Sequence, residues 1–118
     1  MGHVMVQVTI SNPVDAGLNA EVEALVDTGA TFTVVPKSLA NRLNLPISGH
    51  REVRTATGPI TLDMARAFVQ IDGDGEINRV LISDVVERVL IGVITLETLS
   101  LTVDPTSGEL KEAEAFLY

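Results

Sequence analysis

The residue types best suited to chemistry in this sequence of 118 residues stand together in one short stretch, Leu25–Thr31. Two apolar residues precede Asp27 and would hold its backbone in a core. Gly29 would let the backbone approach closely or adopt a positive φ, so that its amide could donate a hydrogen bond to the carboxylate. The small Ala30 leaves room for a substrate or a water molecule. This pattern predicts a carboxylate presented in a tight turn after a buried strand.

A carboxylate of this kind hydrolyses peptide bonds as one of a pair. Two carboxylates in contact cannot both ionise cheaply, so they share one proton. One then acts as general base on a water molecule, and the other donates a proton to the carbonyl oxygen. The Asp-Thr-Gly sequence at residue 27 occurs once. We therefore expect a homodimer, in which a two-fold axis brings Asp27 of each chain together.

Other chemistries find less support in the sequence. The absence of cysteine excludes thiolate nucleophiles and cysteine zinc sites, and His3 and His50 lack the spacing of metal ligands. Asp72–Glu76 resembles a calcium loop, but Ile77 and Ser83 stand where such a loop needs Gly and Glu, so we interpret it as a polar hairpin turn. The sequence also contains no Gly-x-Ser-x-Gly elbow. We expect neither a metal nor a cofactor.

Two aspartates have simpler interpretations beside the catalytic one. Asp27 could serve as a turn residue that accepts hydrogen bonds from nearby amides. The stretch 104–108, Asp-Pro-Thr-Ser-Gly, resembles a second acidic motif, but Pro105 follows the carboxylate directly and no apolar run follows the glycine. We interpret this stretch as an ordinary turn.

Short strands would have to position Asp27. Alternating apolar residues and turn residues predict extended segments at 1–10, 19–26, 51–55, 60–64, 67–71, 77–82, 85–91, 101–103 and 109–113. A loop is expected at 12–17, with hairpin turns at 56–59, 72–75 and 105–108. A helix should open at Pro36 and end near Asn44, and a second should cover 94–99. The strand spacing predicts an all-β domain with one or two short helices over residues 1–118.

Composition limits the partners. Hydrophobic residues make up 46% of the chain and aromatic residues 3%, which predicts an aliphatic core. The net charge of −8 and the scattered basic residues argue against nucleic-acid binding. Residues 1–10 alternate instead of forming a signal peptide, and the apolar stretch 89–103 is too short to span a bilayer. We expect a soluble, cytoplasmic protein without membrane contact.

Several of these segments resemble one family. Leu25–Thr31 is similar to the active-site motif of the retropepsin-like aspartic proteases. Val34-Val35-Pro36 before a helix, Thr55–Pro59 at the position of the flap, and Val89-Leu90-Ile91-Gly92 before a short helix also agree with that family. The resemblance extends from about residue 19 to residue 109.

The resemblance implies a closed or partly open acid-protease barrel that acts as a homodimer on a peptide or protein substrate. Asp27 would be the catalytic residue, and the substrate would lie extended and add main-chain hydrogen bonds like an extra strand. Thr28 would form hydrogen bonds across the dimer. The other implied site residues are Gly29 and Ala30 in the floor, Ala56, Thr57 and Gly58 in the flap, and Ile91 and Gly92 as support.

The chain also departs from the family. Val93 stands where viral members usually carry an arginine, and the single tyrosine, Tyr118, is far from the flap. Residues 116–118 could interleave with a partner chain, as the ends of viral dimers do. Two alternatives therefore remain: a retropepsin-fold dimerisation or peptide-binding module without proteolysis, and a single-site hydrolase that uses Asp27.

Overall fold

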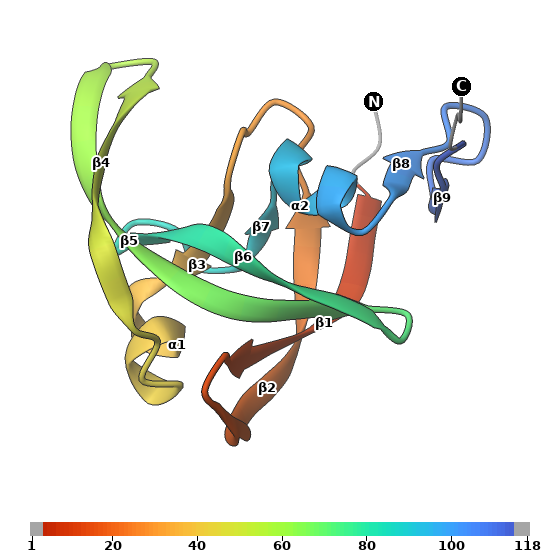
Figure 1. The fold of residues 1–118 in the computed structure, drawn as a ribbon. Coiled ribbons are helices and arrows are strands. Elements are labelled where there is room, and N and C mark those ends of the chain that lie inside the picture. Colours follow the sequence, from red (N-terminus) through yellow and green to blue (C-terminus); the bar gives the residue numbers. More distant parts are fainter. Residues whose placement is uncertain (1–3, 115–118) are drawn as a thin grey trace, which may run out of the picture.

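A curved seven-stranded sheet dominates the computed structural model, which describes residues 4–114 (Figure 1). Two short helices and a separate two-stranded sheet complete the fold. The elements in chain order are β1 (Val4–Asn12), β2 (Asp15–Val26), β3 (Thr33–Pro36), α1 (Lys37–Arg42), β4 (Ile47–Thr55), β5 (Gly58–Ile71), β6 (Asp74–Ser83), β7 (Leu90–Ile91), α2 (Val93–Thr98), β8 (Leu101–Val103) and β9 (Leu110–Glu112).

The sheet closes on itself. Its order is β1-β2-β7-β3-β6-β5-β4, and β1 also pairs antiparallel with β5, where Ile10 faces Val69. This pairing turns every strand of the sheet except β4 into the wall of a barrel. The hairpin of β4 and the first part of β5 stands out from the barrel as an arm (Figure 1). The all-β barrel with two short helices agrees with the expected fold class.

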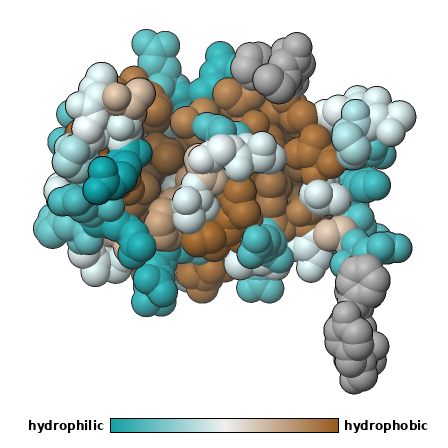
Figure 2. Space-filling view, turned by 90° about the horizontal axis from the view of Figure 1, so that it is seen from above, coloured by the Kyte–Doolittle hydropathy of each residue, from teal (hydrophilic) through white to brown (hydrophobic). Residues whose placement is uncertain are grey.

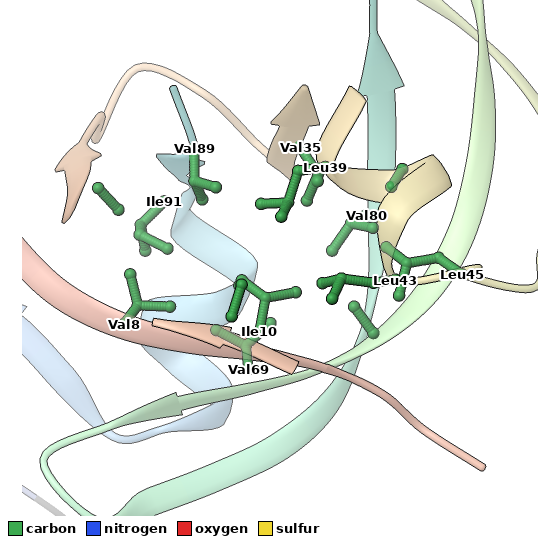
Figure 3. Packing of buried hydrophobic residues seen from close by; sticks show 14 of the residues in the cluster. Val8, Ile10, Val35, Leu39, Leu43, Leu45, Val69, Val80, Val89 and Ile91 are labelled. Atoms are coloured by element: carbon green, nitrogen blue, oxygen red, sulfur yellow. The ribbon is translucent and has the colours of Figure 1, made fainter. Parts of the chain in front are cut away.

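The barrel is filled with aliphatic side chains. Val8 and Ile10 of β1 point toward Val69 of β5 and Val80 of β6, and all four are nearly inaccessible to solvent (Figure 3). Val35, at the end of β3, joins them. These residues alternate with more exposed neighbours along each strand. The alternation of apolar residues in the sequence therefore predicts correctly which side chains face the core.

Strand β5 is longer than expected. The sequence predicted separate strands at 60–64 and 67–71, whereas β5 runs without interruption through Ala65 and Arg66. No turn residue separates the two halves, and the strand continues because it changes partners, from β4 on the arm to β6 and β1 in the barrel. The expected loop at 12–17 is similarly shortened, because β2 already begins at Asp15.

The segment 85–91 was wrongly predicted as one buried strand. Only its last two residues form β7, and Val85 is 79% exposed. The Val85 amide donates a hydrogen bond of 3.2 Å to the hydroxyl of Ser83, the last residue of β6. The chain can pair only where it enters the gap between β2 and β3: the Val89 carbonyl accepts a hydrogen bond of 3.0 Å from the Leu25 amide, and β7 begins at Leu90.

Helix boundaries also differ slightly from expectation. Pro36 is the last residue of β3 and caps α1, which ends at Arg42. β4 begins at Ile47, four residues before the expected strand.

Over residues 4–114, neither helix is long or apolar enough to cross a membrane. The expectations for residues 1–3 and 116–118 lie outside the described part of the chain.

Candidate active site

Asp27 lies at the end of β2, in a turn held by its own backbone. The Gly29 amide donates a hydrogen bond of 3.0 Å to Oδ1 of Asp27, and the Ala30 amide donates one of 3.1 Å to the Asp27 carbonyl. The bond from Gly29 is the one expected from the sequence. Gly29 does not have a positive φ, but an added Cβ would lie 3.3 Å from Oδ1. The glycine therefore serves the close approach of amide and carboxylate.

Strand β7 supports this turn from below. It lies between β2 and β3, the two strands that flank the turn. The Asp27 amide donates a hydrogen bond of 2.9 Å to the Ile91 carbonyl, and the Val93 amide donates one of 2.9 Å to the Ala30 carbonyl. Both ends of the turn are thereby fixed to one short segment of the chain, although that segment lies more than 60 residues later.

Gly92 is where this support comes closest. A Cβ on Gly92 would lie 2.5 Å from both the carbonyl carbon and the carbonyl oxygen of Phe32, and 2.9 Å from the Thr33 amide nitrogen. Its φ is −93°, so the backbone conformation does not require glycine. Space alone excludes a side chain here, because each of the clashing atoms belongs to the backbone.

A buried network of polar side chains beneath the turn was missed by the sequence analysis. The Gly92 amide donates to the Thr33 hydroxyl at 3.0 Å, and that hydroxyl lies 2.6 Å from the Thr95 hydroxyl. Thr95 and Thr98 in turn donate to Oδ1 of Asn78, at 3.4 and 3.1 Å. Thr33, Thr95 and Asn78 are almost fully buried. Only Thr33 carries a signal in the sequence, as a threonine in the otherwise apolar strand β3.

A groove of about 600 Å³ opens in front of Asp27. Gly29, Ala30 and Phe32 of the turn line it on one side, and residues 51–55 of the arm line it on the other. Seen from above, apolar residues gather in the hollow beside the arm, with polar residues around the rim (Figure 2). The apolar lining consists mainly of Val34, Val53, Ile60, Leu62, Leu81, Val85 and Val86.

The expected flap residues lie at the tip of the arm. Ala56 and Thr57 are exposed, and Gly58 has a φ of +121° that closes the turn between β4 and β5. The Thr55 hydroxyl donates a hydrogen bond of 2.7 Å to the Gly58 carbonyl. The tip does not line the groove, and the sides of the arm do. Ile60 and Leu62, which alternate with polar residues, carried the signal for the β5 side, whereas β4 contributes Val53 among polar residues.

The remaining residues expected at the site differ in exposure. Thr28 is exposed in the turn, whereas Ile91 is fully buried behind it. Asp104 is a turn residue, as expected: it accepts a hydrogen bond of 2.8 Å from the Thr106 amide. That hydrogen bond is the main cause that holds the pKa of Asp104 below its ordinary value. Among residues 4–114, no group of three or more His, Asp or Glu is placed to hold a metal ion.

Comparisons with known proteins agree with this geometry. The chain resembles the solution structure of the simian foamy virus (mac) protease, with 19% identity and a TM-score of 0.59 over 80% of this chain and 93% of that chain. It also resembles the EIAV protease complexed with the inhibitor HBY-793, with 18% identity and a TM-score of 0.66 over 98% of this chain and 94% of that chain. Among curated proteins, no sequence matches.

The family model described as "Aspartyl protease" matches residues 6–93, which include Asp27, the arm and β7. This match covers well over half of the chain, and the two viral structures share its fold. The chain therefore belongs to the aspartyl protease family, as an aspartic endopeptidase with the retropepsin-like fold.

Proposed function

We propose that the chain hydrolyses peptide bonds as a homodimer, with a water molecule activated by Asp27 and its counterpart in a second copy. The observation that carries this proposal is the Asp27 carboxylate itself. It is held by the Gly29 amide and lines a groove of about 600 Å³ in a chain of the aspartyl protease family. One chain supplies one such carboxylate, and two-fold symmetry would supply the second.

The hydrogen bonds of Asp27 suit a shared proton. Oδ1 accepts from Gly29, and within residues 4–114 the side chain has no other hydrogen-bond partner. Oδ2 is therefore available to a water molecule or to the opposite carboxylate. In the dimer, the ionised carboxylate would take a proton from the water as it attacks the peptide carbonyl, and the protonated one would donate to the carbonyl oxygen.

The surrounding residues would hold this pair and the substrate. Exposed Thr28 would form hydrogen bonds across the two-fold axis, while Ile91 and Gly92 would keep the turn rigid from behind. The peptide would lie extended between the turn and the arm and form main-chain hydrogen bonds with it. Closure of the tip, Ala56–Gly58, would then exclude water from the groove.

The alternative is a dimerisation or peptide-binding module that keeps the fold without proteolysis. The exposed position of the tip, outside the groove, is the observation in its favour. A single-site hydrolase that uses Asp27 as a monomer is the third possibility. The expected cytoplasmic location and the absence of nucleic-acid partners stay predictions from the sequence.

Substitution of the carboxylate tests the proposal. We expect Asp27→Asn to reduce cleavage of a mixed peptide library by at least about a hundredfold, because the amide cannot act as a general base. Cleavage is measured by mass spectrometry between about pH 3 and 8, and dimer mass by light scattering. Asp72→Asn is the matched control, since Asp72 is exposed in the β5–β6 turn with a φ of 52° that asparagine tolerates.

Each alternative has its own outcome. A folded wild-type dimer that cleaves no peptide over this pH range would support the binding module. A strict monomer that cleaves peptides would support the single-site hydrolase. The proposal requires a dimer whose activity disappears with Asp27→Asn and persists with Asp72→Asn.

A further inference from the structure

A second cavity, of about 470 Å³, adjoins the groove and shares Phe32 and Arg51 with it. Three arginines line this cavity, Arg51, Arg66 and Arg79, and no acidic residue does. The whole chain has 8 Lys and Arg residues against 16 Asp and Glu. The lining of this cavity is therefore positively charged, although the molecule as a whole is negatively charged.

Two of these arginines lie side by side on one face of the sheet. Arg66 of β5 is paired directly with Arg79 of β6, and both side chains are exposed on the face opposite the barrel core. Like charges at directly opposite positions destabilise a sheet. In the described part of the chain, the ion pairs are His50–Asp63 and Asp104–Lys111, so neither guanidinium group forms an ion pair with a carboxylate there.

The third arginine is held in place by an aromatic ring. The Arg51 guanidinium lies 5.0 Å from the centre of the Phe32 ring, within the range of a cation–π interaction. Phe32 follows the Asp27 turn directly and Arg51 belongs to the arm, so this contact joins the two sides of the groove. The positive charge of Arg51 thus lies at the boundary between the groove and the second cavity.

Strand geometry places the second cavity within reach of a bound peptide. Leu81 of β6 lines the groove, while Arg79 and Ile77, on the same face of that strand, line the second cavity. Two residues of a strand span about 6.6–6.8 Å. An extended peptide that runs along β6 covers the same distance with two residues. A peptide side chain two positions from the one over Leu81 would therefore meet Arg79.

We propose that Arg51, Arg66 and Arg79 form a subsite for an acidic side chain, aspartate or glutamate, of the peptide substrate. This inference rests on the proposed function, because it takes the substrate to lie in the groove. The guanidinium forks can each donate two hydrogen bonds to a carboxylate, which would also relieve the repulsion between Arg66 and Arg79. Since the molecule as a whole repels acidic peptides, the selection would depend on this short-range contact.

A glutamate scan of the substrate tests the subsite. One cleaved parent peptide of small and apolar residues is made with a single Glu at each position in turn, and with Gln at the same position as its partner. We expect Glu to raise kcat/KM by about fivefold or more over Gln at one position, and to lose this advantage as salt increases. Equal rates for Glu and Gln at every position would overturn the proposal.

Arginine variants identify the residues responsible. Arg66→Gln and Arg79→Gln should each reduce the Glu-to-Gln ratio of kcat/KM, and the double variant should bring this ratio close to one. Lys37→Gln is the matched control, because it removes an exposed positive charge that lines neither cavity. A preference for Glu that persists in the double variant would contradict the proposal, because residues other than these arginines would then select Glu.

A binding measurement separates this inference from the proposed function. Rhodamine-labelled peptides of the same scan are titrated with the Asp27→Asn protein and followed by fluorescence anisotropy. Tighter binding of the Glu peptide, lost in the double arginine variant, supports the subsite even if no peptide is cleaved by the wild-type chain. Equal binding of Glu and Gln peptides rejects the subsite even if proteolysis is found.

Discussion

At the scale of the residue, Ala30 is the position where a small change should alter the chemistry most cleanly. Its side chain lines the groove with Asp27 and offers no hydrogen bond. A hydroxyl at this position would donate to the ionised carboxylate and stabilise it. We therefore expect Ala30→Ser to move the acidic limb of the pH–activity profile to lower pH. The profile of kcat/KM for both proteins measures this, and an unmoved acidic limb would contradict it.

Some residues could be assigned from sequence because their partners are neighbours. The hydrogen bond from Gly29 to Asp27 spans two residues, so the order of residue types predicts it. The roles of Thr33, Asn78 and Thr95 could not be found in this way, because three distant segments of the chain form their network. Gly92 is intermediate: the family resemblance implied that it supports the site, whereas the reason, contact with the Phe32 backbone, needs the fold.

At the scale of the element, β7 and β3 depend on that network. Thr33→Val keeps the shape of the side chain but leaves the buried Gly92 amide without its acceptor. We expect a loss of about 1–3 kcal/mol in the free energy of unfolding, measured by urea denaturation. Thr33→Ser should restore most of it. Thr61→Val, at an exposed position of β5, is the control and should change stability little.

The same element shows why strand limits were hard to predict. Periodicity reports which residues can face a core, but not whether a neighbouring strand is present to pair with them. Residues 85–91 include several apolar residues, yet only Leu90 and Ile91 pair as strand residues, with β2 and β3, and Val89 adds one hydrogen bond from the Leu25 amide. β5 is the converse case, since a new partner extends it past the point where the pattern ends.

At the scale of the whole molecule, the net negative charge should oppose the formation of a dimer. Each chain carries a net charge of −8, so a dimer brings together two bodies of like charge. We expect the monomer–dimer Kd to fall when salt rises from about 20 to 200 mM, because screening weakens the repulsion. Sedimentation at both salt concentrations measures it. A Kd that rises with salt would show that ion pairs hold the dimer.

Strand β5 belongs to the arm and to the barrel at once. Residues 58–62 pair with β4 alone, while from Asp63 onward the strand pairs with β6, and Phe68 to Gln70 pair with β1 as well. A bulge in β4 between Ile47 and Gly49 lies opposite the change of partners. The outer part of the arm, where residues 58–62 pair with β4, can therefore unfold locally as a small cooperative unit while the barrel stays folded. Amide protons at 58–62 should then exchange with solvent through this local opening, and those at 67–71 only through global unfolding.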